Sequence, residues 1–216
     1  MELNKYIEHT LLKPNAVKAD FIKLFEEAKE YNFYGVCVNP NYVKLAAEHL
    51  KKSKIKIITV VGFPLGANTS GVKAYEAAMS IISGADEIDM VMNITALKNY
   101  EYDLVIEDIK KVKKACKKKR LKVILETGLL TRREIRKACE LCVLARADFV
   151  KTSTGFARGG AKTEDVKLMY DTVSPYGLRV KASGGIRDKE TALKMIEAGA
   201  SRLGTSSGAA IMTAKK

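Results

Sequence analysis

The sequence predicts a single-domain α/β protein with a (β/α)8 TIM-barrel fold spanning residues 1–216. Short apolar segments rich in β-forming residues alternate with amphipathic segments along the whole chain, which is typical of parallel strands joined by helical crossovers. Eight such units occur, and no Pro-rich, Ser-rich or low-complexity linker divides them. The length of 216 residues lies near the lower edge for a barrel, and an open doubly wound sheet is the alternative.

The predicted strands are short apolar runs bounded by polar residues. They lie at 6–10, 34–39, 57–62, 87–93, 122–127, 148–153, 178–183 and 201–206. The hydrophobic content of 47% is enough for one full core in a chain of this length. The strands and helices are therefore expected to share a single domain.

The predicted helices carry apolar residues at spacings of three and four, which places these residues on one face. In the helix at 19–31, Phe21, Leu24, Phe25 and Ala28 form such a stripe. The other predicted helices lie at 71–85, 102–117, 131–147 and 189–200. Three helices run into the next strand through small residues, at 83–86, 145–148 and 198–201. We expect these residues to let a helix end pass close to the sheet.

The net charge of +13 is compatible with nucleic acids, membrane surfaces or anionic small molecules as partners. The densest basic run, at 109–120, has Ile109, Val112, Ala115 and Cys116 at helical spacing, so its lysines are expected on the solvent face of a helix. No aromatic residue interleaves with them, so a stacking surface for bases is missing. We expect no nucleic-acid partner, and a basic RNA-binding module is the less favoured alternative.

The cysteines and the N-terminus bear on the protein's compartment. The four cysteines are too sparse for a disulfide scaffold, and the pair Cys139 and Cys142 lies in a predicted helix with no second pair. Packing in the core is the expected role of this pair, rather than metal binding. The N-terminus shows no secretory signal, and no apolar stretch approaches a membrane span. We expect a cytoplasmic protein without a membrane partner.

Polar residues collect at the C-terminal ends of the predicted strands, where a barrel builds its active site. They are Thr10, Asn39, Asp89, Asn93, Glu126, Thr127, Lys151, Thr152, Lys181, Ser183 and Ser206. Two lysines, an aspartate and a glutamate within or at the end of apolar strands need partners or a chemical role, because buried charges are costly.

Two glycine-rich turns, at 181–192 and 203–210, follow the last two strands and lead into helices. Glycines let backbone N–H groups approach a ligand, and a helix N-terminus favours an anion. Barrels commonly hold phosphate at this position, where Ser206, Ser207 and Arg187 can add donors. The turns predict a phosphate site. No nucleotide-binding motif occurs, so no nucleotide cofactor is indicated.

Lys151 and Lys181 lie on successive strands and are expected to be neighbours at the mouth of the barrel. Burial and a second ammonium group each lower the pKa of a lysine, so one of the two can attack a carbonyl and form a Schiff base. Asp89 and Glu126 are both candidates for moving protons. The alternative is that each lysine only binds the phosphate as a point charge.

Eight stretches carry a resemblance to a known family. They are IEHTLLKPNA, GVCVNP, VVGFPLGA, GADEIDMVMN, VILETGLL, DFVKTSTGF, VKASGGIR and RLGTSSG, in the family's order and over nearly the whole chain. The sequence closely resembles the deoxyribose-phosphate aldolases, which are class I (Schiff-base) aldolases. The resemblance implies a (β/α)8 barrel and reversible cleavage of 2-deoxy-D-ribose 5-phosphate to D-glyceraldehyde 3-phosphate and acetaldehyde. It implies no metal or organic cofactor.

The resemblance also assigns roles to residues. The lysine of the VKTSTG motif, here Lys151, would form the Schiff base, Lys181 would be the second catalytic lysine, and Asp89 would assist proton transfer. The phosphate-binding residues would be Gly155, Gly184, Gly185, Gly204, Ser206 and Ser207, with Thr10 and Cys37 near the sugar. A homo-oligomer, either a dimer or a tetramer, is also implied.

Two positions depart from the family pattern. Glu8 stands where the family has an aspartate, which alters the reach of that carboxylate, and no tyrosine follows Tyr176, whereas some members end in a catalytic tyrosine. The alternatives to this activity are a different Schiff-base aldolase or a sugar-phosphate isomerase with the same phosphate grip.

Overall fold

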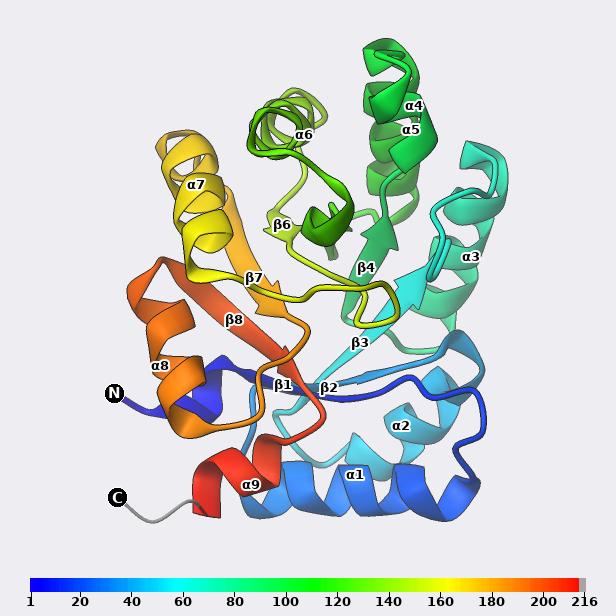
Figure 1. Ribbon diagram of the computed structural model, residues 1–216. Helices are drawn as coiled ribbons and strands as arrows, with labels where there is room; N and C mark the ends of the chain where they lie inside the picture. Colours follow the sequence, from blue (N-terminus) through cyan, green and yellow to red (C-terminus); the bar gives the residue numbers. More distant parts are fainter. Residues whose placement is uncertain (214–216) are drawn as a thin grey trace.

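The computed structural model, which describes residues 1–213, is a closed barrel of eight parallel strands in sequence order, with β8 paired to β1 (Figure 1). The strands are β1 (Ile7–Leu11), β2 (Gly35–Val38), β3 (Lys56–Val61), β4 (Glu87–Val91), β5 (Arg120–Ile124), β6 (Phe149–Lys151), β7 (Arg179–Ser183) and β8 (Ala200–Thr205). The predicted barrel is confirmed, and the open doubly wound sheet is excluded.

Helices surround the strands and connect each to the next (Figure 1). They are α1 (Lys18–Glu30), α2 (Val43–Leu50), α3 (Ser70–Ile82), α4 (Ile94–Lys98), α5 (Tyr102–Ala115), α6 (Arg132–Leu144), α7 (Thr163–Val173), α8 (Lys189–Glu197) and α9 (Gly208–Thr213). Short 3-10 helices lie at Leu3–Tyr6, Pro40–Tyr42, Thr127–Leu129 and Ser174–Tyr176. The predicted helices do not include α2, α4, α7 and α9; of these, α2 and α7 complete the second and sixth crossovers.

Local sequence signals explain where several helices begin and which face they bury. The predicted stripe of α1 is buried as Phe21, Leu24, Phe25 and Ala28. At the start of α6, the Glu134 carboxylate accepts from the Thr131 N–H at 2.7 Å, and Thr131 Oγ1 accepts from the Glu134 N–H at 3.3 Å. This capping box satisfies backbone donors that the first helical turn leaves free.

The small residues at the helix-to-strand turns bring neighbouring helices together. A Cβ on Gly84 would lie 2.8 Å from Ala47 Cβ of α2, and one on Gly199 would lie 2.4 Å from the Tyr170 ring of α7. The close approach is therefore to the preceding helix, whereas the sequence predicts an approach to the sheet. The third such turn contains Arg146, whose φ of 58° lies in the left-handed region.

The apolar residues form two separate layers. The larger layer fills the space between the strands and the surrounding helices. The smaller layer consists of Leu12, Cys37, Ile58 and Val60, with Phe63 packed against it. Because alternate residues of a strand point to opposite faces, the inside of the barrel receives only half of each strand. This smaller cluster lies in the part of the interior next to β2 and β3, and the rest of the interior holds charged side chains together with apolar ones such as Phe149, whose ring centroid lies 5.9 Å from Lys122 Nζ.

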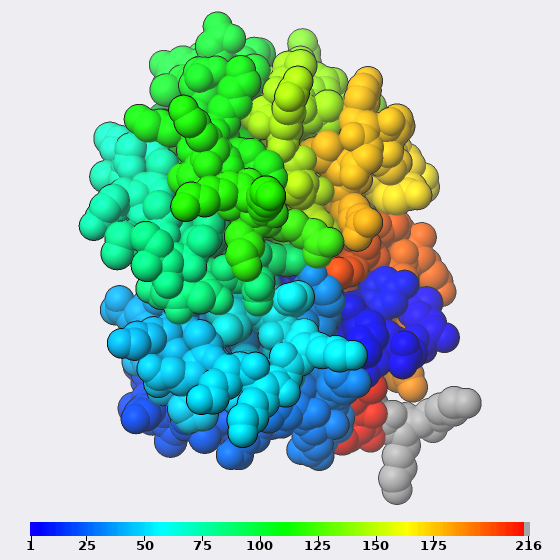
Figure 2. Space-filling view, turned by 180° about the vertical axis from the view of Figure 1, so that it is seen from behind, coloured from blue at the N-terminus to red at the C-terminus, as the bar shows by residue number. Residues whose placement is uncertain are grey.

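Helix α5 carries the first part of the basic run, with Ile109, Val112 and the following Cys116 buried, but it ends at Ala115, so the lysines at 117–119 lie in the turn before β5. Figure 2 shows the opposite face of the molecule, where the N-terminal segment (dark blue) lies beside chain coloured orange and red from near the C-terminus.

Within residues 1–213, no helix has the length and apolar character needed to cross a membrane.

Candidate active site

Lys151 and Lys181 are direct neighbours across the β6–β7 pair, as predicted. Both side chains converge on Asp89 of β4. Lys151 Nζ donates to Asp89 Oδ2 at 2.9 Å, and Lys181 Nζ donates to the same oxygen at 2.7 Å. Residues separated by 62 and 92 positions in the chain therefore share one carboxylate inside the barrel.

Three further charged side chains, those of Lys122, Glu87 and Glu8, complete this cluster. The sequence predicts no role for Lys122 and Glu87, and it singles out Glu8 only as a departure from the family pattern. Lys122 Nζ lies 2.9 Å from Asp89 Oδ1, 2.6 Å from Glu87 Oε2 and 3.5 Å from Glu8 Oε1. Glu8 also pairs with Lys181. Three lysines and three carboxylates thus balance one another in the interior, and we call these six residues the ion cluster: Glu8, Glu87, Asp89, Lys122, Lys151 and Lys181.

The neighbouring charges of the ion cluster favour the charged forms of Asp89 and Lys181. Burial works to raise the pKa of Asp89, but Lys122, Lys151 and Lys181 outweigh it and hold the pKa well below its ordinary value. Burial works to lower the pKa of Lys181, but the carboxylates of Asp89 and Glu8 raise it above the ordinary value. The expectation that the two lysines depress each other is therefore wrong for Lys181, because carboxylates across the barrel exceed the effect of the neighbouring ammonium groups.

Lys151 differs from the other two lysines in its surroundings. Among the described residues, its ammonium group has one carboxylate within 4.0 Å, whereas Lys181 has two and Lys122 has three. Loss of a proton from Lys151 therefore breaks the fewest ion pairs. Lys151 also lines the cavity at the mouth of the barrel, with Asp89 and Lys181 beneath it.

Glu126, the other proton-transfer candidate, lies outside the ion cluster. Its carboxylate accepts from the Thr154 N–H at 3.2 Å and from the Thr154 hydroxyl. The hydroxyl of Thr154 in turn accepts from the Phe156 N–H at 3.1 Å. Glu126 thus orders the loop that follows β6, and the geometry favours Asp89 as the carboxylate beside the lysines.

Glycine at position 204 provides room for Lys181. Gly204 lies in β8, paired with Ser183 and Glu8, and a Cβ there would lie 3.0 Å from Lys181 Cε. The Lys181 side chain therefore passes directly over the backbone of β8. Gly204 was predicted to bind phosphate, and the geometry adds this packing role to its position in the cavity wall.

The cavity at the mouth has a volume of about 400 Å³ and gathers most of the predicted binding residues. Those that line it are Thr10, Gly155, Gly184, Gly185, Gly204 and Ser206, and the predicted catalytic residue Lys151 lines it as well. Lys13 and Arg187 add positive charge, so the cavity suits an anionic group. Gly184 has a φ of 93°, and a Cβ on the neighbouring Gly160 would lie 2.7 Å from the Gly184 carbonyl oxygen. This close approach brings the loop after β6 against the loop after β7.

Two predicted binding residues do not line this cavity. Cys37 is fully buried in the apolar layer inside the barrel, where burial raises the pKa of its thiol. Ser207 is half-buried, and its N–H donates to Thr205 Oγ1 at 2.9 Å. The start of α8 is also not free for an anion, because the Asp188 carboxylate accepts from the Thr191 N–H at 2.8 Å. Phosphate binding by this helix terminus is therefore not supported.

Phe156 lines the same cavity and forms an edge-to-face pair with Phe63, with 5.2 Å between ring centroids. Both rings belong to loops that follow strands, β6 and β3. Such pairs are favourable beyond the area that they bury. The pair therefore makes an apolar rim on one side of the charged cavity.

The cysteines within residues 1–213 are all buried, and none of them lines the mouth cavity. The four cysteines are free and buried, and Cys139 and Cys142 pack in the layer beneath α6. Burial raises the pKa of Cys116 to about 12. No group of three or more His, Cys, Asp or Glu side chains in this part of the chain is arranged to hold a metal ion.

Known proteins resemble this chain along almost its whole length. The family model described as DeoC/LacD family aldolase matches residues 5–214. A deoxyribose-phosphate aldolase from Enterococcus faecalis is 58% identical over 99% of this chain and 97% of that protein. One from Streptococcus suis is 59% identical over 98% of this chain and 96% of that protein.

Solved structures agree with these relatives. A tetrameric deoxyribose phosphate aldolase from Aeropyrum pernix superposes with a TM-score of 0.91 at 33% identity, covering 97% of this chain and 89% of that one. A structure described as "QR15, an Aldolase" gives a TM-score of 0.93 at 45% identity, covering 97% and 93%. Matched along its length by the family model and by these relatives, the chain belongs to the DeoC/LacD aldolase family.

Proposed function

We propose that the protein is a class I deoxyribose-phosphate aldolase, a lyase that reversibly cleaves 2-deoxy-D-ribose 5-phosphate to D-glyceraldehyde 3-phosphate and acetaldehyde. The observation that carries the proposal is the position of Lys151. It is the lysine of the ion cluster that lines the cavity, and it contacts Asp89 at 2.9 Å. A lysine that can lose its proton beside a carboxylate is the arrangement that Schiff-base formation needs.

The first half of the reaction forms the imine. The neutral amine of Lys151 attacks the C1 aldehyde of the open-chain sugar, and the resulting carbinolamine loses water to give a protonated imine. Asp89 and Lys181, 2.7 Å apart, supply the acid and base for these proton transfers. The ion pairs with Glu8 and Lys122 hold Lys181 and Asp89 in position while Lys151 changes its charge.

The second half breaks the carbon–carbon bond. A base removes the proton of the C3 hydroxyl, the C2–C3 bond breaks, and its electron pair moves into the imine to form an enamine on Lys151. The C3 oxygen becomes the carbonyl oxygen of glyceraldehyde 3-phosphate. The enamine then takes a proton at C2, and water releases acetaldehyde and restores the lysine amine. The protonated imine acts as the electron sink, so the reaction requires no further cofactor.

The phosphate of the substrate would lie in the cavity, against the wall made by the loops after β6, β7 and β8. Arg187 and Lys13 supply charge there, and Gly155, Gly185 and Ser206 line the wall. Ser207, which lies just beyond the wall, stays a predicted phosphate ligand that would need a small movement to reach. Phosphate binding by these residues supplies binding energy at a distance from the reacting carbons.

A substrate comparison tests the proposal. The enzyme should release acetaldehyde from 2-deoxy-D-ribose 5-phosphate, measured with alcohol dehydrogenase and NADH. The substrate has no C2 hydroxyl, so an aldose–ketose isomerase would leave it intact. Unphosphorylated deoxyribose should have a kcat/KM lower by about a hundredfold or more, since each charged hydrogen bond is worth about 1.5–3 kcal/mol. No acetaldehyde, or equal efficiency with both sugars, would contradict the assignment.

A pair of variants tests the phosphate grip separately. Arg187→Gln should raise the KM for the phosphorylated sugar and leave turnover of the unphosphorylated sugar unchanged. Arg133→Gln removes the same charge from an exposed position on α6 and should change neither. Equal KM values for the two variants would remove Arg187 from the site.

We also infer assembly into a homo-oligomer through the outer face of α3. Val72, Tyr75, Met79 and Ile82 are large apolar side chains spaced by three, four and three residues, and all are exposed. Such a stripe is typical of a helix face that packs on another helix. The structural neighbour from Aeropyrum pernix is described as tetrameric, and this supports a second copy of the chain as the partner. The cytoplasmic location stays a prediction.

A further inference from the structure

A second cavity lies at the opposite end of the barrel from the candidate active site. Its volume is about 480 Å³, compared with about 400 Å³ for the cavity at the mouth. Arg120, Phe149 and Arg179, which line it, are the first residues of β5, β6 and β7. It is therefore built from the N-terminal ends of three adjacent strands, and the proposed aldolase reaction leaves it without a role.

The charge of this lower cavity is strongly positive. Three arginines line it, Arg120, Arg146 and Arg179, with Asp148 as the acidic residue of the lining. The Asp148 carboxylate is already used, because it pairs with Lys113 of α5 and accepts from the Leu121 N–H at 2.7 Å. Among the described residues, neither Arg146 nor Arg179 has a carboxylate within 4.0 Å. The guanidinium groups of Arg146 and Arg179 thus have no counter-charge among the described residues, and the cavity beside them has room for an anion.

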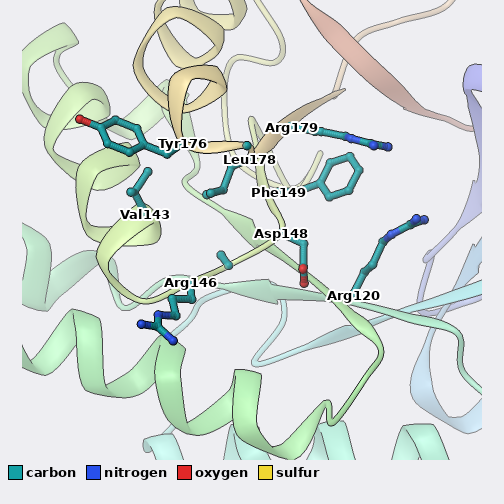
Figure 3. Close-up of a pocket in the computed structure, with 10 residues that line it drawn as sticks. Arg120, Val143, Arg146, Asp148, Phe149, Tyr176, Leu178 and Arg179 are labelled. Atoms are coloured by element: carbon teal, nitrogen blue, oxygen red, sulfur yellow. The ribbon is translucent and has the colours of Figure 1, made fainter.

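The arginines are arranged around an apolar wall. Figure 3 shows Arg120 and Arg179 extending on either side of the Phe149 ring, with Leu178 and Val143 farther along the cavity. Arg120 is held in place, since Nη1 donates to Glu87 Oε1 at 2.9 Å and to the Tyr34 hydroxyl at 2.8 Å. A guanidinium group fixed in this way loses little entropy when it binds an anion.

We propose that the lower cavity is a binding site for a small phosphate monoester, whose phosphate lies between Arg120 and Arg179 and whose organic group contacts Phe149 and Leu178. Guanidinium groups recognise phosphate through paired charged hydrogen bonds, and an apolar wall beside them favours an ester over a free ion. The proposal goes beyond the aldolase reaction and does not depend on it, because no residue of this cavity lines the mouth cavity.

Arg179 is the residue to change in a test. Arg120 also contacts Glu87 of the ion cluster, so its removal would disturb catalysis as well as the lower cavity. Arg179 is exposed and has no such contact. Arg179→Gln should therefore leave kcat for aldol cleavage unchanged while it weakens binding in the lower cavity.

The experiment is a titration of the whole protein with phenyl phosphate, followed by the NMR signals of the arginine Nε–H groups. The signals of Arg146 and Arg179 should shift to saturation, and the binding followed on Arg146 should weaken by about tenfold or more in Arg179→Gln. Arg133→Gln, with the same charge change on α6, should bind as the wild type does. Ligand in the mouth cavity would not move these signals, which separates the two sites.

Three results would overturn the proposal. One is the absence of saturable shifts at Arg146 and Arg179, or shifts that potassium chloride at equal ionic strength reproduces. The second is unchanged affinity in Arg179→Gln. The third is inorganic phosphate binding as tightly as phenyl phosphate, which would show that the apolar wall takes no part and that the site does not recognise an ester.

Discussion

Replacement of Lys122 by methionine tests how much the barrel depends on the balance of charges inside it. Lys122 is fully buried, and its ammonium group lies within 3.5 Å of Glu8, Glu87 and Asp89. Methionine keeps most of the side-chain volume but removes the charge. The three carboxylates of the ion cluster are then opposed inside the barrel by two ammonium groups, those of Lys151 and Lys181, and Glu87 keeps only the partly exposed Arg120 as its counter-charge.

The expected loss of unfolding free energy is about 3–5 kcal/mol at neutral pH, the range for removal of one partner from a buried ion pair. The control is Lys119→Met, which breaks a 3.0 Å pair with Asp86 on the surface. Both members of that pair are partly exposed, so its removal should cost about 1 kcal/mol or less. The difference between the two variants isolates the effect of burial.

The pH dependence of this loss has a definite sign. Burial works to raise the pKa of Glu87, but Lys122 and the hydrogen bonds to this carboxyl outweigh it and lower the pKa to about 2. A carboxyl with a lowered pKa adds stability above its unfolded value of about 4.3 and loses this contribution as the pH falls toward 2. The deficit of Lys122→Met should therefore be largest at neutral pH and shrink below about pH 4.

The assay is urea-induced unfolding followed by circular dichroism, for both variants and for Lys122→Met combined with Glu87→Gln. The double variant removes one charge of each sign and should recover part of the lost free energy. A deficit for Lys122→Met no larger than that of Lys119→Met would refute the reasoning. So would a double variant less stable than Lys122→Met alone.

Two further predictions concern Lys181. Lys181→Leu should lower kcat by about a hundredfold or more, because it removes a proton-transfer group. Borohydride should still trap acetaldehyde on Lys151 in this variant. Near-normal turnover would exclude Lys181 from the proton transfers. Gly204→Ala should lower the free energy of unfolding in urea by about 1–3 kcal/mol and also lower kcat, since its Cβ would lie 3.0 Å from Lys181 Cε. Wild-type stability and wild-type kcat would show that Lys181 can pass over β8 in another way.

Much of the barrel follows from local sequence, because each strand and most helices carry their own pattern. The strand positions agree with the structure to within a few residues, and the stripe of α1 is the one predicted. Strand β6 ends at Lys151 rather than at residue 153, because the chain turns into the loop held by Glu126. The short helix α2 spans eight residues, too few to show a clear period.

The ion cluster shows the limit of local reasoning. Lys122 is the first residue of a predicted strand, where a lysine is usually interpreted as a polar residue outside the core. The pairing of β4 with β5 places it beside Asp89, its partner in the register, and closure of the barrel brings Glu8 of β1 within 3.5 Å of its ammonium group. The raised pKa of Lys181 has the same origin, since Glu8 is 173 positions away in the chain. One signal was available: Glu87 precedes Asp89 by two residues and so shares its face of the strand.

Trapping of the imine tests directly whether Lys151 forms the Schiff base. The protein is incubated with acetaldehyde and sodium borohydride, and the modified residue is located by mass spectrometry of its peptides. We expect a single reduced ethyl adduct on Lys151 and none in Lys151→Ala. An adduct on Lys122 or Lys181, adducts scattered over the surface lysines, or no adduct at all would contradict the assignment of Lys151 as the Schiff-base residue.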